Sequence, residues 1–293
     1  MPKLRKRSDP DPISSTKVHI AKEKLYIDGL AVPCTQFGPD GGKPLVIVHG
    51  WAGWWETFTE EILLKEAYRA GIRVLALDSP SWDPEAVENS YEKFRGIIRE
   101  VVNRTPVERV SICGQSAGSL IAALFALHYP ERTEKLILAS PPATIVNGRR
   151  GRKITKDTIA VIRGNPFLFK LANRVQKGRL YNLVGARIAL QNFDWKLFET
   201  HIYPAALQCD LRVALLNNES ALSFDWENIY PRISAPTAII TGDGDPVSRV
   251  SDCEKLCHLL PDARLFVIPH ARHGIMMEKP HEFAKLIVDF VAD

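Results

Sequence analysis

The sequence predicts an α/β fold in which helices cover both faces of a mostly parallel, doubly wound sheet. Short, continuous apolar runs bounded by turn residues recur along the chain, which is typical of strands buried on both faces. Stretches with apolar residues at helical spacing lie between these runs. The alternation stops over residues 141–231, which predicts a mostly helical cap inserted between two late strands of the sheet.

Eight strands are expected in chain order. The first two, at 18–27 and 30–35, alternate only loosely, and a Gly-Pro-Asp-Gly-Gly turn at 38–42 follows them. The other six are short apolar runs at 45–48, 74–77, 110–113, 136–139, 238–240 and 265–268. Helices are expected at 56–69, 84–103, 117–128 and 280–291, because apolar residues recur there every three or four positions.

Three parts follow from this pattern. The core is expected to consist of residues 18–140 and 232–293, and the cap of residues 141–231. Residues 1–17 are rich in Lys, Arg and Pro and are expected to form a disordered basic tail rather than a nucleic-acid patch.

Composition is that of an ordinary globular protein. The 293 residues carry a formal net charge of +4 and are 45% hydrophobic, which excludes disordered, collagenous and coiled-coil chains. The longest apolar run, 120–127, is too short for a membrane span, and no secretory signal begins the sequence. We therefore expect a cytoplasmic protein without a membrane span and without a nucleic-acid partner.

The five cysteines are odd in number and form no C-x-x-C motif, which favours structural thiols in a reducing compartment. Cys253, Cys257 and His258 are close in sequence, but they are too few for a zinc site. No metal site is expected.

The strongest motif is Gly114-Gln115-Ser116-Ala117-Gly118. It stands between a predicted buried strand and a predicted helix, which is the context in which a G-x-S-x-G turn presents a nucleophilic serine. Small residues two positions before and after Ser116 are needed because the turn is sharp. The pattern indicates that Ser116 is a nucleophile.

A serine hydroxyl needs a base, and the base needs an orienting acid. His273 follows the strand at 265–268 and Asp245 follows the strand at 238–240, so both belong to loops at the same end of the sheet as Ser116. His270 and Asp243 lie two or three residues away and are alternatives for the two roles.

These motifs resemble the α/β-hydrolase superfamily, in its capped branch of esterases, cofactor-free perhydrolases and carbon–carbon bond hydrolases. The family's Gly-x-x-Asp pattern falls on Gly242 and Asp245, which favours Asp245 over Asp243. Its late His-Gly falls on His273-Gly274, and its early His-Gly on His49-Gly50. The resemblance implies an oxyanion hole formed by the backbone N–H groups of Trp51 and Ala117.

The sequence also departs from the family pattern at two places. The run after Asp78, from Ser79 to Asp83, lacks the glycine-containing turn that is common in relatives. The strand at 136–139 ends in Ser140, so a triad acid supplied from that strand is not expected.

The expected reaction is hydrolysis of a carboxylic ester of a mainly apolar small molecule through an acyl-serine intermediate, with no metal or organic cofactor. Carbon–carbon hydrolase, lactonase, thioesterase and perhydrolase chemistry on the same triad are alternatives. A ligand-binding receptor is an alternative of another class. The residues expected to contact substrate are Gly50, Trp54, Trp82, Gln115 and Met276.

One segment departs from the overall charge balance. Residues 149–187 contain eleven Lys and Arg and a single acid, Asp157, against a net charge of +4 for the whole chain. A solvated face is the ordinary interpretation. The alternative is that the cap meets an anionic partner, such as a membrane surface, an acidic acyl carrier or a carboxylated substrate. The sequence leaves open whether the chain is a monomer or a dimer.

Overall fold

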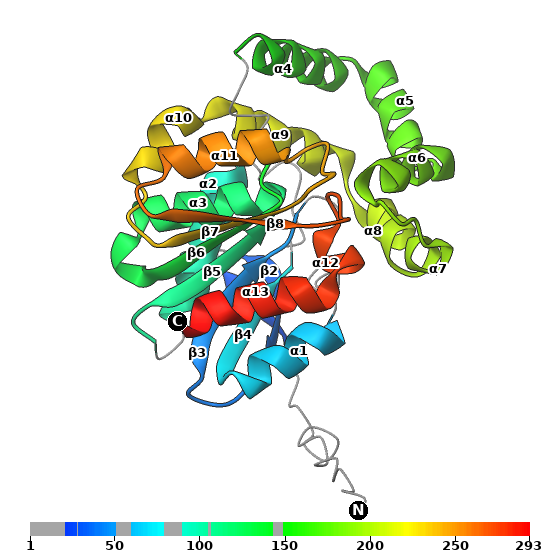
Figure 1. Cartoon of the computed structure of the whole chain (residues 1–293). Coiled ribbons are helices and arrows are strands. Elements are labelled where there is room, and N and C mark those ends of the chain that lie inside the picture. Colours follow the sequence, from blue (N-terminus) through cyan, green and yellow to red (C-terminus); the bar gives the residue numbers. More distant parts are fainter. Residues whose placement is uncertain (1–20, 28, 51–59, 79–89, 105–106, 143–148) are drawn as a thin grey trace, which may run out of the picture.

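The computed structural model describes residues 21–27, 29–50, 60–78, 90–104, 107–142 and 149–293. Its centre is an eight-stranded sheet with the order β1-β2-β4-β3-β5-β6-β7-β8 (Figure 1). The pairings β1–β2 and β2–β4 are antiparallel and all others are parallel, as predicted. The strands are β1 (Ala21–Ile27), β2 (Leu30–Phe37), β3 (Lys43–Val48), β4 (Ile72–Leu77), β5 (Val110–Gln115), β6 (Thr133–Ala139), β7 (Thr237–Gly242) and β8 (Ala263–Ile268).

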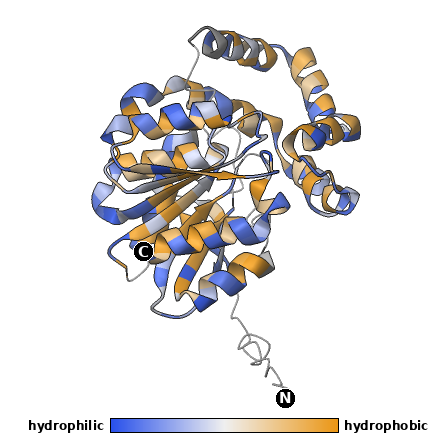
Figure 2. Ribbon diagram, viewed as in Figure 1, coloured by the Kyte–Doolittle hydropathy of each residue, from blue (hydrophilic) through white to orange (hydrophobic). Residues whose placement is uncertain are grey.

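The central strands are mainly apolar because both faces of the sheet are covered. In β3, Val46 and Val48 join the apolar cluster on one face, and Leu45 and Ile47 join the cluster on the other. Side chains alternate between the two faces of a strand, so a strand buried on both faces has few polar positions. Figure 2 shows the resulting apolar centre of the sheet.

Helices form a layer on each face of the sheet (Figure 1). Helices α2 (Ser90–Asn103), α3 (Ala117–His128) and α11 (Val250–Leu259) supply residues to one apolar cluster. Helices α1 (Glu60–Arg69), α12 (Ile275–Glu278) and α13 (Pro280–Ala292) supply the other. A short 3-10 helix, η2 (Pro130–Arg132), links α3 to β6.

The predicted helical cap is present between β6 and β7, which are hydrogen-bonded neighbours in the sheet. Figure 1 shows α4 to α8 as an arc that stands away from the sheet, whereas α9 and α10 return over the core. The cap elements are α4 (Arg149–Gly164), α5 (Pro166–Gln176), α6 (Arg179–Ala189), α7 (Trp195–Leu197), the π-helical η4 (Phe198–Ile202), α8 (Tyr203–Gln208), α9 (Leu211–Ser223), α10 (Trp226–Ile229) and the 3-10 helix η5 (Tyr230–Arg232).

Local sequence explains where several cap helices begin. The Asn165 side chain accepts hydrogen bonds from the backbone N–H groups of Phe167 and Leu168, and Pro166 occupies the first turn of α5. Asp210 caps α9 in the same way, through the N–H of Arg212 at 2.7 Å. Such caps satisfy backbone donors that have no partner within the helix.

Two expected helices are described only in part. The helices expected at 56–69 and 84–103 begin at Glu60 and Ser90 in the structure, and their first expected residues lie outside the described ranges. Among the helices that the structure describes, none is both long and apolar enough to cross a membrane.

Candidate active site

Ser116 occupies the sharp turn between β5 and α3. Its backbone has φ 48° and ψ −120°, a conformation that a residue with a side chain rarely adopts. The backbone N–H of Ser116 donates to the carbonyl oxygen of Ala139 at 2.9 Å, which ties the turn to the neighbouring strand β6. This hydrogen bond helps to hold the turn in its strained conformation.

The two glycines of the motif allow this turn to form. A Cβ at Gly114 would overlap the backbone of Gly118, and a Cβ at Gly118 would overlap the carbonyl oxygens of Val48 and His49. Strands β5 and β3 and the first turn of α3 therefore approach closely only because both positions lack a side chain. The sharp turn thus requires small residues at both positions, as the motif predicts.

His273 lies between the Ser116 hydroxyl and the Asp245 carboxylate. Its Nε2 atom is 3.0 Å from Ser116 Oγ, and its Nδ1 atom is 2.9 Å from Asp245 Oδ2. An ionised carboxylate only accepts hydrogen bonds, so Nδ1 carries the proton and Nε2 is left to accept from the serine hydroxyl. The three residues come from loops after β5, β7 and β8 and meet at one end of the sheet.

Asp245 is buried and remains ionised because hydrogen bonds compensate for the loss of water. Burial by itself raises the pKa of this carboxyl, but hydrogen bonds from His273, Ser248 and Val247 outweigh it, and the net pKa is lowered. Its Oδ1 atom accepts from the backbone N–H groups of Val247 and Ser248 at 2.8 and 2.9 Å. Asp245 can therefore stabilise a positive charge on His273.

The alternative residues Asp243 and His270 point elsewhere. Asp243 is exposed, and its carboxylate accepts from the backbone N–H of Ala271 at 3.3 Å. Backbone hydrogen bonds, from His270 first, lower the pKa of Asp243. His270 is exposed in a turn at φ 55°. The structure thus brings Ser116, His273 and Asp245 together, and it gives Asp243 a turn-forming contact instead.

The structure describes only some of the other residues that are expected at the site. Trp51, Trp54 and Trp82 lie outside the described residues. Ala117 begins α3 directly after Ser116. A Cβ at Gly50 would overlap the side chain of Gln115 and crowd Ser116 Cβ, so both Gly50 and Gln115 lie beside the serine.

Met276, a predicted substrate contact, lies in the apolar core, and its contact with substrate stays a prediction. It is 2% exposed and belongs to the apolar cluster around α1 and α13.

A family comparison identifies the fold around this serine, histidine and aspartate. The family model of the alpha/beta hydrolase fold matches residues 43–280. The chain belongs to the alpha/beta hydrolase fold family.

Relatives within this family differ in their named reactions. The chain is 28% identical over 269 residues to a 2-hydroxy-6-oxononadienedioate/2-hydroxy-6-oxononatrienedioate hydrolase of Comamonas testosteroni, covering 86% of this chain and 88% of the relative. Among solved structures, an esterase from Exiguobacterium antarcticum superposes with a TM-score of 0.76 at 19% identity, covering 92% of this chain and 99% of the esterase. The 2-hydroxy-6-oxo-6-phenylhexa-2,4-dienoate hydrolase of a Rhodococcus species superposes with a TM-score of 0.72 at 15% identity, covering 93% of this chain and 99% of that one.

In this alpha/beta hydrolase, one glutamate joins the cap to the histidine loop. Glu278 Oε1 accepts from the backbone N–H groups of Gln191 and Asn192 at 2.6 and 3.0 Å, and Oε2 accepts from Arg272 N–H at 2.7 Å. The backbone N–H of Gly274 also donates to Ala189 at 3.0 Å. No sequence pattern indicates a role for Glu278, because two of its three backbone partners lie more than eighty residues away in the chain.

Ser248 is a second residue of the site that the sequence did not indicate. Its hydroxyl donates to the carbonyl oxygen of Pro141, and its own carbonyl accepts from the Thr241 hydroxyl at 2.7 Å. Because Ser248 N–H also bonds Asp245, these contacts fix the Asp245 turn to the end of β6 and to β7. A serine in a loop carries no signal of this role in the sequence.

His49, of the early His-Gly pair, is buried and neutral. Burial lowers its pKa from 6.5 to about 4, against an opposing hydrogen bond to the Gly50 carbonyl at 2.6 Å. The carbonyl can only accept, so Nδ1 of His49 carries the proton. His49 thereby fixes the backbone of Gly50, which follows β3 and lies beside Ser116.

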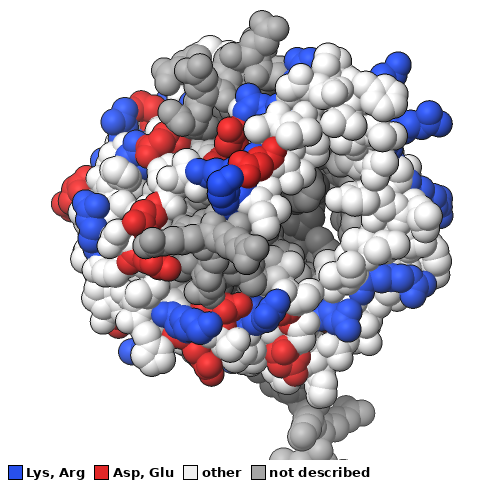
Figure 3. Space-filling model, turned by 90° about the horizontal axis from the view of Figure 1, so that it is seen from above, with Lys and Arg blue, Asp and Glu red and all other residues white. Residues whose placement is uncertain are grey.

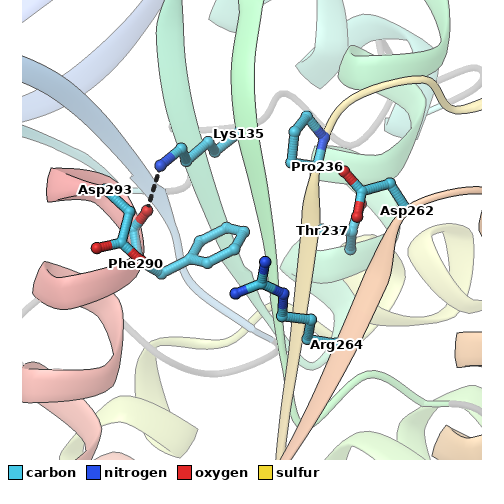
Figure 4. A pocket seen from close by; sticks show the side chains of 7 residues that line it. All are labelled: Lys135, Pro236, Thr237, Asp262, Arg264, Phe290 and Asp293. Atoms are coloured by element: carbon cyan, nitrogen blue, oxygen red, sulfur yellow. Dashed lines mark hydrogen bonds between the residues drawn. The ribbon is translucent and has the colours of Figure 1, made fainter.

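A small cavity lies at the other end of the sheet, away from Ser116 (Figure 4). It is bounded by both acidic and basic side chains, and Lys135 Nζ there donates to the carbonyl oxygen of Phe290 at 2.6 Å. Thr237 in its wall begins β7, whereas Asp245 follows the other end of that strand. The cavity is therefore separate from the candidate site.

Proposed function

We propose that the chain is a serine hydrolase that cleaves a carboxylic ester of a mainly apolar small molecule through an acyl-serine intermediate. The observation that carries the proposal is the continuous hydrogen-bonded series from Ser116 Oγ through His273 to Asp245. A serine hydroxyl becomes an effective nucleophile when a base within hydrogen-bond reach accepts its proton. The distances from His273 to Ser116 and Asp245 support His273 as that base and Asp245 as the orienting acid.

In the first half of the reaction, Ser116 Oγ attacks the ester carbonyl carbon while His273 Nε2 takes the hydroxyl proton. The carbonyl oxygen becomes an oxyanion, for which we propose the backbone N–H groups of Ala117 and Trp51 as donors. The intermediate then collapses, the C–O bond to the alcohol breaks, and His273 returns its proton to the leaving alcohol. Ser116 is left acylated.

In the second half, water replaces the alcohol. His273 takes a proton from the water as it attacks the acyl-serine carbonyl, and the proton then passes to Ser116 Oγ as the C–O bond to the serine breaks. The carboxylic acid leaves and the free serine is restored. Asp245 stays ionised throughout and stabilises the imidazolium formed in each half.

A carbon–carbon bond hydrolase is the second candidate. It is favoured by the sequence relatives whose names describe hydrolases of 2-hydroxy-6-oxo dienoates, since one of them matches across 86% of this chain. The same serine, histidine and aspartate would be used, so the residues do not separate the two reactions. A direct comparison of a p-nitrophenyl ester with 2-hydroxy-6-oxo-6-phenylhexa-2,4-dienoate separates them by which substrate turns over faster.

The test of the shared mechanism is the Ser116→Ala variant. It should lose about 10⁴-fold or more of turnover on whichever substrate the wild type prefers, because the three residues act as one unit. Only a hydroxyl is removed, so the circular dichroism spectrum should be unchanged. A folded variant that retains a tenth of wild-type turnover would contradict the proposal.

A further inference from the structure

The cap carries most of the large apolar side chains that remain exposed in the described part of the chain. Eleven of thirteen such side chains lie between Ile154 and Leu207, and only Tyr26 and Val267 lie elsewhere. Figure 2 shows these apolar positions on helices that stand away from the sheet. Exposed apolar side chains gathered in one region indicate a surface that meets a partner.

On α5 the exposed apolar residues form one stripe. Phe167, Leu171 and Val175 are 73%, 49% and 48% exposed and are spaced four residues apart. Residues at this spacing lie on one side of a helix. Gln176, nearly opposite on the helix, is buried and donates to the carbonyl oxygen of Ala206 at 3.4 Å. The stripe is therefore the side of α5 that the rest of the cap leaves uncovered.

Helix α6 repeats the arrangement. Leu180, Val184 and Ile188 are 74%, 50% and 51% exposed, again four residues apart, whereas Ala186 on the opposite side is buried. We refer to these three residues, with Phe167, Leu171 and Val175, as the apolar stripes. A helix that packs only within its own domain would place such residues toward the core. Helices α5 and α6 both place them toward solvent instead.

Cations accompany the stripes without acidic partners. Lys170, Arg174 and Lys177 are exposed, and Arg174 lies almost on the same side of α5 as Phe167. Other cap cations, such as Arg163 and Arg179, pair with Glu219 and Glu199, but within the described chain no carboxylate pairs with these three. Figure 3 shows mainly Lys and Arg along the outer rim on the cap side, whereas both signs mix over the core.

We propose that the apolar stripes and the cations beside them dock the cap on an anionic lipid surface. Apolar side chains with flanking Lys and Arg are the composition of helices that lie in a membrane interface. A second copy of the chain fits the stripes less well, because it would place the same uncompensated cations against one another. An anionic bilayer supplies both an apolar layer and the missing negative charge.

Docking of this kind would bring the lipid surface close to the site. The end of α6 is joined to the histidine loop, since Arg272 Nη1 donates to the carbonyl oxygen of Arg187 at 3.1 Å and Glu278 bonds the residues that follow α6. The inference stands on the cap alone and does not require the proposed ester chemistry.

The experiment is sedimentation of the full chain with vesicles of phosphatidylglycerol and phosphatidylcholine, compared with vesicles of phosphatidylcholine alone. Wild type should bind the anionic vesicles at 0.1 M salt and lose affinity as salt rises, because exposed charges are screened. The variant K170Q/R174Q/K177Q should bind about a hundredfold more weakly, at roughly a fivefold loss for each surface cation. The variant F167S/L171S/L180S should also lose binding.

Two matched control variants test whether the loss of vesicle binding is specific to the cap cations. K24Q/K255Q/K285Q removes three exposed lysines from the core, and K3Q/R5Q/K6Q removes three cations from the N-terminal segment. Both should bind as wild type does. Thermal unfolding of every variant should stay within a few degrees of wild type, which separates lost binding from lost folding.

Three results would overturn the proposal. The first is wild-type protein that ignores anionic vesicles or binds neutral ones equally well. The second is loss of binding in the N-terminal control instead of in the cap variants. The third is a wild-type dimer in light scattering that F167S/L171S/L180S converts to monomer, because the stripes would then be an interface between copies.

Discussion

At the scale of single residues, two carboxylates separated by one glycine have different environments. Asp245 is buried and bonds His273, whereas Asp243 is exposed and bonds only backbone. Asp245→Asn should lower turnover by about 10⁴-fold, because an amide presents the wrong hydrogen-bond partner to His273. Asp243→Asn, the matched control, should stay within a few fold of wild type. The measurement is steady-state turnover of both variants, and equal losses would show that Asp243 shares the role.

The buried His49 leads to a second prediction at this scale, which concerns the pH dependence of stability. Its pKa is lowered to about 4 in the folded chain from 6.5, so between these values the unfolded chain binds the extra proton. The free energy of unfolding should therefore rise with pH across this window and fall by about 3 kcal/mol as pH drops from 6.5 to 4.

Urea unfolding at several pH values measures this effect. His49→Gln should lose that part of the pH dependence, since glutamine does not titrate, while His281→Gln at an exposed position should keep it. Identical pH slopes for wild type and His49→Gln would contradict the buried, neutral state of His49.

At the scale of elements, Glu278 at the end of α12 connects the cap to the loop that holds His273. Glu278→Ala removes the acceptor of three backbone N–H groups, two of them exposed and one part-buried, and a net hydrogen bond of this kind contributes about 0.5–1.5 kcal/mol. We expect faster amide exchange at 187–192 and 270–274 and a turnover at least tenfold lower, with the sheet unchanged.

Glu282→Ala is the matched control for this change, because Glu282 is exposed in the first turn of α13. Hydrogen-exchange mass spectrometry and turnover should both be near wild type for it. If Glu278→Ala leaves exchange at 187–192 unaltered, the glutamate does not hold the cap to the histidine loop.

At the scale of the whole molecule, the sheet was predictable because its central strands are buried on both faces. Runs such as 45–48 and 136–139 are apolar without interruption, and β3 and β6 extend them by a few residues. The sharp turn at Ser116 was predictable for a similar reason, since the close approach of backbone atoms requires Gly114 and Gly118. In both cases a steric requirement restricts which residue types can occupy neighbouring positions, and this restriction can be recognised in the sequence.

Other features of the site and the cap have no local signal in the sequence. Glu278 and Ser248 act through backbone groups that are distant in sequence, so their residue types carry no information about their partners. The exposure of the cap's aromatic residues has no local signal in the sequence either. Phe198 and Trp226 are buried, but Phe167 and Trp195 are 73% and 51% exposed, and only the assembled cap distinguishes them.

The central claim is that Ser116 is a nucleophile activated by His273, and a covalent probe tests it most directly. A fluorophosphonate reacts with an activated serine by losing fluoride as the Ser116 Oγ–P bond forms and His273 takes the proton. Peptide mass spectrometry should find the adduct on Ser116 alone, and folded His273→Ala protein should show little labelling. An adduct on another serine, or full labelling of Ser116 without His273, would contradict the account.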